Sequence, residues 1–323
     1  MDGKIKRILI IKPSSFGDII HALPSVAALK RAYPNSRIYW IVFKVWADIA
    51  RLCPDIDEII VWDRNKIVRS FFEIVKKYKK TEFDYIIDLQ GLLRSAILAK
   101  TLNGKVKIGV SGMKEFSSLL IKEVYPENAK INAVMRNLKT IEFITKTSAE
   151  PKINLNLQKA DLDGAEEILK SFAVKKDFIA LLPFARGIGK DWGESNYLQL
   201  LPLLKEKYPK TDIVILGMQK DFGKIKSTLA IDLCGKTALK QLPAILAKSK
   251  YSVGADTGAM HLAAVLNIPS VFIWGNSDIV ETSPYLGRVA ILENKLNKKD
   301  IAAISPQAVI EALEKLQSLN ACI

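Results

Sequence analysis

The sequence has few cysteines, and their arrangement excludes both a disulfide framework and a metal-binding pattern. Cys53, Cys234 and Cys322 are odd in number and widely separated, whereas disulfide scaffolds and zinc sites use paired or closely spaced cysteines. We therefore expect reduced thiols in a reducing compartment.

Long hydrophobic runs are also missing. The apolar run near the N-terminus, Ile8–Ile11, is too short for a signal peptide and is closed by Lys12. The longest uncharged run, Thr257–Ser277, is interrupted by Pro269 and Gly275 and divides into a helix, a turn and a strand. We therefore expect no transmembrane helix.

The common phosphate-binding signatures are absent as well. Neither Gly-x4-Gly-Lys-Ser/Thr nor Gly-x-Gly-x-x-Gly occurs, so the motifs that usually indicate a kinase or a dehydrogenase are missing. Zinc-finger spacing, RNP-like aromatic motifs and Arg-rich runs are missing too. Nucleic acid is therefore not a predicted partner.

Positive charge is abundant and unevenly distributed. The formal net charge is +14. Residues 1–150 contain 26 Lys and Arg against 16 Asp and Glu, a net charge of +10, whereas the remainder contains 22 against 18, a net charge of +4. The first half is thus expected to meet an anionic partner; a phosphorylated substrate and an anionic membrane surface both fit.

Strand-like and helix-like segments alternate along all 323 residues, a length that suits two domains. Such alternation predicts parallel sheets covered by helices on both faces, and hence two Rossmann-like halves. Between Lys114 and Thr147 the pattern predicts one or two helices. Ser148–Leu157 is the candidate linker. The predicted strands are Arg7–Ile11, Arg37–Phe43, Glu58–Val61, Tyr85–Leu89, Val106–Ile108, Phe178–Leu182, Asp212–Leu216, Tyr251–Val253 and Ser270–Trp274.

Residues 251–277 form the clearest candidate for a ligand site. A short apolar strand leads into Asp256, Thr257 and Gly258, and an apolar helix and a second strand follow. A helix start of this kind offers free N–H groups and a positive dipole end to a phosphate. Asp256 is suited to cap the helix and Thr257 to bond a phosphate oxygen; the alternative that all three residues serve only as a cap is equally well supported by these residues alone. His261, in the first turn, favours the ligand site slightly.

A second candidate follows the first strand. The loop from Lys12 to Asp18 contains Ser14 and Ser15, which suit an anionic or hydroxyl-rich ligand. Asp18 ends the loop, where folds of this class place active groups. The alternative is that Asp18 only caps a helix beginning at Ile19, and the residues alone favour this cap.

A third candidate is the loop Pro183–Gly193, after the first strand of the second half. Its two glycines and two cations suit a pyrophosphate, since Arg186 can bind bidentately and Lys190 acts as a point charge. A solvated loop is the less favoured alternative. Asp221 either accepts a ribose hydroxyl or opens the helix after it.

In chain order these motifs resemble glycosyltransferase family 9. The resemblance rests on SSFGD at 14–18 with LP at 23–24, DLQGL at 88–92 with Arg94, KDW at 190–192, and DTG at 256–258 with His261. It spans nearly the whole chain and is closest to the lipopolysaccharide heptosyltransferases of type I.

The resemblance implies a GT-B fold, that is, two Rossmann-like domains with parallel sheets facing a central cleft. Residues 1–155 would bind the acceptor and residues 156–323 the nucleotide-sugar. It implies inverting transfer of heptose from ADP-heptose to the Kdo sugar of Kdo-lipid A, with no metal and no cofactor. The implied location is cytoplasmic, peripheral on the inner face of the inner membrane, whose anionic surface is a further expected partner.

The resemblance also implies roles for single residues. Asp18 would be the general base that takes the proton of the acceptor hydroxyl. The departing diphosphate would be stabilised by Lys190 and by N–H groups at the start of the helix. The implied donor-binding residues are Arg186, Lys190, Asp221, Asp256, Thr257, Gly258 and His261. The implied acceptor-binding residues are Lys12, Ser14, Ser15, Arg94 and Arg136.

Two alternatives stay open. One is a family 9 transferase with another nucleotide-sugar or one that acts at a later heptose position. The other is a nucleotide-sugar-binding module without catalysis. The turn at Gly275-Asn276-Ser277 and the Ala185-Arg186 pair depart from the family pattern at the donor side, so the donor is where these alternatives differ most.

Overall fold

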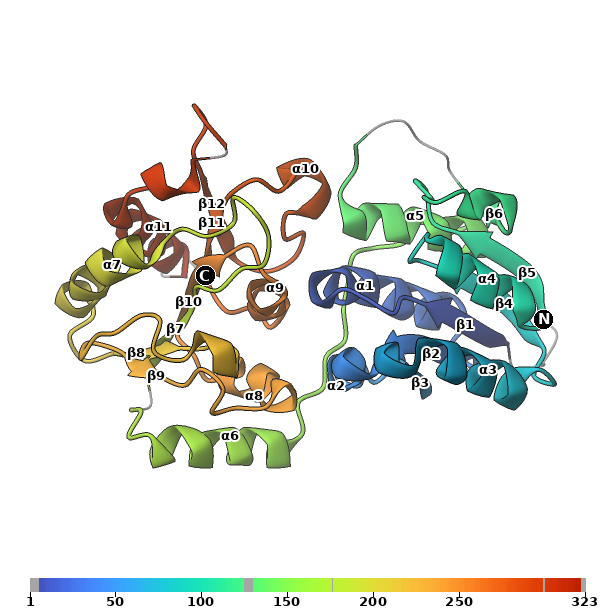
Figure 1. Cartoon of the computed structure of the whole chain (residues 1–323), viewed down its shortest axis with the longest axis horizontal. Helices are drawn as coiled ribbons and strands as arrows, with labels where there is room; N and C mark the ends of the chain where they lie inside the picture. The colour runs from blue at the N-terminus through green and yellow to red at the C-terminus, as the bar shows by residue number, and fades with distance from the viewer. Residues whose placement is uncertain (1–5, 125–129, 176, 299, 321–323) are drawn as a thin grey trace. The chain divides into compact units, whose positions relative to one another are not determined.

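The computed structural model describes residues 6–124, 130–175, 177–298 and 300–320. The chain divides into two compact units, Met1–Asn156 and Leu157–Ile323 (Figure 1). Residues 148–158 form neither helix nor strand, and the candidate linker lies within this stretch. Each unit contains one sheet.

The first unit is built on a six-stranded parallel sheet in the order β3-β2-β1-β4-β5-β6. Its strands are β1 (Arg7–Ile11), β2 (Arg37–Phe43), β3 (Glu58–Trp62), β4 (Phe83–Asp88), β5 (Gly104–Gly109) and β6 (Lys122–Glu123). Its helices are α1 (Phe16–Ala32), α2 (Ala47–Ala50), α3 (Ile67–Tyr78), α4 (Leu93–Thr101) and α5 (Ala133–Thr145), with short 3-10 turns η1 (Lys44–Trp46), η2 (Arg64–Lys66) and η3 (Ser117–Leu119).

The second unit contains another parallel sheet, ordered β12-β11-β10-β7-β8-β9. Its strands are β7 (Phe178–Leu182), β8 (Asp212–Ile215), β9 (Ile231–Asp232), β10 (Tyr251–Ala255), β11 (Ser270–Trp274) and β12 (Val289–Glu293). Its helices are α6 (Lys159–Ser171), α7 (Glu194–Lys207), α8 (Leu242–Ala247), α9 (Gly258–Val265), α10 (Ile279–Thr282) and α11 (Pro306–Asn320), with η4 (Gln219–Asp221), η5 (Leu239–Gln241) and η6 (Ile301–Ala303). Within the described ranges, no helix combines enough length and apolar character to cross a bilayer.

Both sheets have the same topology. Counted from the first strand of its own unit, each follows the Rossmann order 3-2-1-4-5-6, so the prediction of two Rossmann-like halves is confirmed. The two neighbouring strands at the centre of the sheet are β1 and β4 in the first unit and β7 and β10 in the second. From these two strands the chain continues toward opposite edges of the sheet. In open α/β sheets, ligands bind beyond the carboxyl ends of such a pair.

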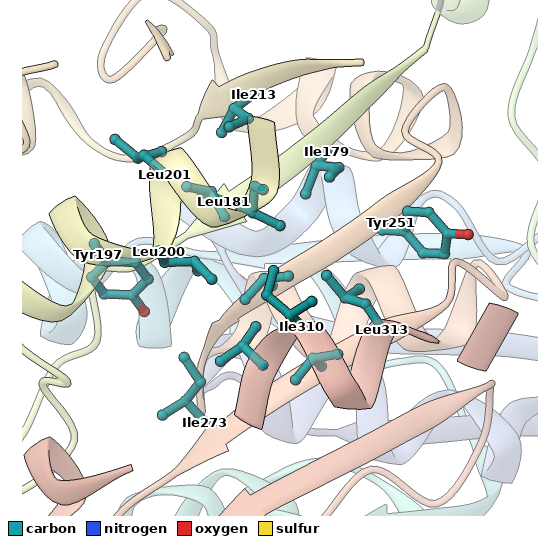
Figure 2. Close-up of a cluster of buried hydrophobic side chains, with 14 of the residues drawn as sticks. Ile179, Leu181, Tyr197, Leu200, Leu201, Ile213, Tyr251, Ile273, Ile310 and Leu313 are labelled. Carbon is teal, nitrogen blue, oxygen red and sulfur yellow. The ribbon is translucent and has the colours of Figure 1, made fainter. Parts of the chain in front are cut away.

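The central strands are mainly apolar and buried, as expected for strands that are covered by helices on both faces. Leu9 and Ile11 of β1 belong to a buried cluster with side chains of α3 and α4. Ile8 and Ile10 point to the opposite face and are also fully buried. In the second unit, Leu181 of β7 packs with residues of α7 and α11 (Figure 2). Rigid sheets therefore support the loops at their carboxyl edges.

The structure differs from the sequence prediction in the region before the linker. Residues 114–147 contain η3, the two-residue strand β6 and α5, rather than only one or two helices. Strand β6 pairs with β5 at the sheet edge. A strand of two residues shows no periodicity in sequence, because alternation needs about four residues to be recognised.

A pair of glycine substitutions tests the packing of the second unit. A Cβ at Gly254 would lie 2.4 Å from the carbonyl oxygen of Leu182 on the neighbouring strand, whereas a Cβ at Gly164 in α6 would meet no atom within 4 Å. We expect Gly254→Ala to lower the free energy of unfolding by about 1–3 kcal/mol. Gly164→Ala should raise it by about 0.5–1 kcal/mol. Urea unfolding followed by circular dichroism measures both; equal stability of Gly254→Ala and the wild type would contradict the strand spacing.

Candidate functional site

The loop after β1 is fastened to the loop after β4. Lys12 is buried, and its Nζ donates to the carbonyl oxygen of Leu89 over 2.9 Å. The backbone N–H of Ser14 donates to Oε1 of Gln90 over 3.2 Å. Because β1 and β4 are the pair at which the chain changes direction, these bonds fix the loop where a ligand is expected.

Asp88, the last residue of β4, shapes the loop that Lys12 contacts. Its Oδ1 accepts hydrogen bonds from the backbone N–H groups of Gln90 and Gly91, and its Oδ2 accepts one from the Ser95 hydroxyl. Burial raises the pKa of Asp88 to about 6, against the effect of these bonds and of Lys12. The fully buried carboxyl group therefore serves the loop rather than a ligand.

Asp18 is the third residue of α1, and 41% of its side chain is exposed. Its Oδ2 accepts from the backbone N–H of Ser15 at 2.8 Å and from the Ser15 hydroxyl at 2.6 Å. The interpretation that Asp18 caps a helix beginning at Ile19 is wrong. Helix α1 begins at Phe16 and its N-cap is Ser15; Asp18 reaches back to the N-cap from the third position, as a capping-box acid does.

The second oxygen of Asp18 faces a cation. Its Oδ1 lies 3.9 Å from Nζ of Lys12. Partial burial acts to raise the pKa of Asp18, but Lys12, the two bonds from Ser15 and His21 outweigh this and hold it below its usual value. Burial lowers the pKa of Lys12; Asp18 opposes this and Arg136 adds to it. Asp18 is therefore charged at neutral pH.

The two predicted acceptor-side arginines lie in different surroundings. Arg136 is in the first turn of α5, close enough to Lys12 to affect its pKa. Its buried Nε has no hydrogen-bond partner among the described residues. Arg94 is exposed at the start of α4, with its guanidinium carbon 5.7 Å from the centre of the Phe43 ring. Lys12, the third cation predicted on the acceptor side, is buried and donates a hydrogen bond to Leu89, so it lies beside Asp18 rather than in open solvent.

In the second unit, polar side chains gather around Asp256. Its Oδ2 accepts from Nζ of Lys190 at 2.7 Å and from the Ser277 hydroxyl, and its Oδ1 lies 3.1 Å from Nε2 of His261. Burial acts to raise the pKa of Asp256, but the contacts with His261, Lys190 and Ser277 outweigh it and hold the pKa well below its usual range. We call these four residues the Asp256 network.

Thr257 caps α9, and the prediction that Asp256 does so is wrong. Oγ1 of Thr257 accepts from the backbone N–H of Met260 at 3.3 Å. Both oxygens of Asp256 are instead occupied by its network. The Thr257 hydroxyl keeps its own proton for donation to a ligand, and Gly258 begins the helix with a backbone N–H that lacks an intrahelical partner.

The loop Pro183–Gly193 is anchored on both sides of Lys190. Trp192 is fully buried, and its Nε1 donates to a backbone carbonyl after η6 over 2.8 Å. The carbonyl of Gly189 accepts from the backbone N–H of Asn276 at 3.0 Å. A Cβ at Gly275 would lie 2.0 Å from this carbonyl, so the approach requires glycine. These contacts place the Lys190 amine beside Asp256.

Arg186 and Asp221 meet at the β8 loop. Nη2 of the exposed Arg186 lies 3.1 Å from Sδ of Met218. Asp221 is buried, and it accepts from the backbone N–H of Met218 at 3.1 Å and from Nζ of Lys224 at 2.7 Å. Asp221 is thus engaged in shaping its own loop.

Two contributors were not among the predicted site residues. Ser277 bonds Asp256, and Gln90 bonds Ser14. Gln90 follows β4 and Ser277 follows β11, so both lie beyond the carboxyl end of a strand, which is a signal that the sequence already contained. Their partners are distant in sequence, however, so the bonds themselves needed the structure.

The chemistry of the two units is complementary. The first presents a charged carboxylate with one oxygen free of hydrogen bonds within the described part of the chain. The second presents a fixed cation and a helix start, which together suit a diphosphate. Across the described residues, no cluster of three or more His, Cys, Asp or Glu side chains is arranged to bind a metal ion.

Known proteins match most of this chain. The model of glycosyltransferase family 9 (heptosyltransferase) matches residues 71–307. Lipopolysaccharide heptosyltransferase 1 of Salmonella typhimurium is 26% identical over 298 residues, which cover 84% of this chain and 89% of the relative. Lipopolysaccharide core heptosyltransferase OpsX of Haemophilus influenzae is 24% identical over 288 residues, 87% of this chain and 82% of the relative.

Solved structures match the fold. The family 9 glycosyl transferase from Veillonella parvula DSM 2008 superposes with a TM-score of 0.85 at 20% identity, covering 98% of both chains. E. coli heptosyltransferase WaaC with ADP-2-deoxy-2-fluoro heptose gives a TM-score of 0.74 at 22% identity, covering 96% of this chain and 99% of its own. The predicted GT-B fold class is thereby confirmed, and the protein is an enzyme: the chain belongs to glycosyltransferase family 9.

Proposed function

We propose that this enzyme transfers heptose from ADP-heptose to the Kdo sugar of the lipopolysaccharide inner core, with inversion. The names of its relatives and the ADP-heptose analogue in the WaaC structure support this donor and acceptor. The observation that carries the mechanism is the asymmetry of Asp18: Ser15 occupies one oxygen, while the other accepts no hydrogen bond from the described residues and lies 3.9 Å from Nζ of Lys12.

We assign Asp18 as the general base. The acceptor hydroxyl oxygen attacks the anomeric carbon of the donor sugar while Oδ1 of Asp18 takes its proton. The bond between that carbon and the diphosphate breaks, and its electron pair leaves with ADP. A single displacement from the opposite face inverts the anomeric centre. Ser15 orients the carboxylate, and Lys12 keeps it ionised before the proton arrives.

The second unit is assigned to the donor. Negative charge grows on the diphosphate as it leaves, and Lys190, the N–H of Gly258 and the dipole of α9 stabilise it. Thr257 donates its hydroxyl to a phosphate oxygen, and the exposed Arg186 supplies a second cation. Within this set, Asp256 and His261 position Lys190. Asp221 shapes the β8 loop, where the ribose is expected.

The first unit is assigned to the acceptor. Lys12, Ser14, Ser15 and Arg94 follow the carboxyl ends of β1 and β4, and Arg136 lies beside Lys12. Residues 1–150 carry a net charge of +10, which complements an acidic Kdo-bearing lipid. We place the enzyme in the cytoplasm, peripheral on the inner face of the inner membrane, where such an acceptor is presented.

A donor screen tests the reaction and the base together. Purified protein is incubated with Kdo-lipid A and a panel of ADP- and UDP-sugars, and nucleotide release and product mass are followed. We expect ADP release and one added heptose with ADP-heptose. Asp18→Asn should reduce transfer by about 100- to 10,000-fold, with ADP affinity unchanged because the diphosphate is assigned to Lys190 and the start of α9.

The control is Asp48→Asn, an exposed acid of the same unit paired with Arg51, which should keep full activity. Transfer by Asp18→Asn within severalfold of the wild type would show that the base is elsewhere. Turnover with a different nucleotide-sugar alone would retain the mechanism and replace the donor.

The pH profile tests the role of Lys12. The pKa of Asp18 is held down by Lys12, and the base must be ionised to act. Lys12→Met should therefore raise the pKa of Asp18, so that the acid-side loss of activity begins at a higher pH than in the wild type. The acid limb of kcat/KM measures this shift, with circular dichroism as a check on folding. Lys44→Met, at an exposed site in η1, is the control; an unmoved acid limb would refute the assignment.

Calorimetric titration with ADP tests Lys190. A charge-assisted bond to phosphate contributes about 1.5–3 kcal/mol, so Lys190→Met should weaken ADP binding by about 10- to 100-fold. Lys298→Met removes an exposed lysine of the same unit that pairs with Glu293, and its affinity should match the wild type. Equal weakening by both variants would indicate a non-specific charge effect.

A further inference from the structure

The outer surface of α4 and η3 in the first unit is apolar. Leu93 and Ile97 are one turn apart on α4 and are 40% and 42% exposed. Phe116 and Leu119, at η3, are 83% and 82% exposed. We call these four residues the α4–η3 surface. Grouped exposed side chains of this kind mark interaction sites, whereas single ones do not.

Hydrogen bonds join the two segments at the carboxyl edge of the sheet. The backbone N–H of Leu93 donates to Oε2 of Glu115 over 3.0 Å. The carbonyl of Gly91 accepts from the backbone N–H of Lys114 at 2.8 Å and from the Ser117 hydroxyl at 3.2 Å. The α4–η3 surface therefore adjoins the loop after β4, which also bonds Lys12 and Ser14.

The backbone turns so that the apolar side chains are exposed. Glu115 and Phe116 have φ values of 57° and 58°, in the left-handed region that non-glycine residues seldom adopt. With this turn Ser117 is fully buried, while its neighbour Phe116 and Leu119 are exposed. A fold selected only for packing would bury the phenylalanine instead of the serine.

Cations outnumber acids around the α4–η3 surface. Arg94, Lys100 and Lys114 are exposed, and none of them forms an ion pair within the described residues. The neighbouring acids are occupied by backbone groups: Glu115 accepts from Leu93, and Glu123 accepts from Gly112 at 2.6 Å. Apolar side chains beside cations that pair with no acid of the described residues suit an anionic lipid surface.

We infer that the α4–η3 surface docks on an anionic lipid bilayer, with Phe116 and Leu119 entering the boundary between head groups and acyl chains. Arg94, Lys100 and Lys114 then lie at the level of the lipid phosphates. The inference rests on the proposed function in one respect: docking here brings the carboxyl edge that contains Asp18 to the membrane that presents a lipid-linked acceptor.

Co-sedimentation of the full-length protein with vesicles tests the docking. We expect binding to phosphatidylcholine vesicles that contain phosphatidylglycerol, weaker binding without it, and loss of binding at high salt. The double variant Phe116→Ser/Leu119→Ser should bind at least about tenfold more weakly than the wild type. Leu296→Ser, fully exposed in the second unit, is the matched control and should bind as the wild type does. Unfolding midpoints should be unchanged, since all three side chains face solvent.

A fluorescence measurement reports insertion directly. Phe116→Trp should gain emission that brominated lipids quench, whereas Leu296→Trp should gain emission that they do not. The wild-type signal is subtracted because the chain has five tryptophans. Equal quenching at the two positions would overturn the proposed orientation.

The remaining outcomes separate this inference from the proposed function. No vesicle binding by the wild type, or equal binding by the double variant, overturns the docking. Loss of self-association in the double variant, seen by sedimentation with vesicle binding intact, would assign the surface to a second copy. The vesicle assay needs neither donor nor acceptor, so a failed donor screen leaves it valid. Normal transfer to a deacylated acceptor without vesicle binding would overturn the docking alone.

Discussion

The pairing of β1 with β4, and of β7 with β10, determines where the polar residues of this enzyme meet. All strands of each sheet are parallel, so their carboxyl ends share one edge. At these two pairs the chain departs to opposite sides and leaves room beyond the strand ends. Asp88 is the last residue of β4, and Lys12 and Asp18 follow β1. Lys190 follows β7, and Asp256 follows β10. Without this topology, residues 66 positions apart such as Lys190 and Asp256 would not share a hydrogen bond.

In each unit a buried charged residue is paired with a more exposed residue of opposite charge, and the sign of the buried charge differs between the two units. In the first, a buried cation, Lys12, keeps the more exposed carboxylate of Asp18 ionised. In the second, a buried carboxylate, Asp256, fixes the more exposed amine of Lys190. In each case the group to which we assign the reaction or the phosphate contact is the partner nearer to solvent, and the buried group has further hydrogen bonds that offset its desolvation. The proposed division of labour between base and diphosphate site depends on this arrangement.

The sequence predicted the fold and the position of the candidate loops at strand ends, because alternating elements and the loops that follow strands are local signals. The three candidate loops at residues 12–18, 183–193 and 256–258 follow β1, β7 and β10, and the motif at 88–92 begins at the end of β4. The helix caps were predicted less well: Ser15 rather than Asp18 begins α1, and Thr257 rather than Asp256 begins α9. Neighbouring hydroxyl and carboxyl residues both favour caps, and long-range bonds decide between them. Burial of Lys12 and Asp221 was equally out of reach, since it depends on packing between distant segments.

The contact between Gly189 and Gly275 has a consequence for protein engineering. Because the carbonyl of Gly189 occupies the space of any side chain at position 275, the loop after β7 and the turn after β11 are complementary surfaces. Asn276 in that turn is bonded to the same carbonyl, and Ser277 is bonded to Asp256. A graft intended to change donor preference would need to transplant both segments together, as one module, because either segment alone would meet a partner shaped for the other.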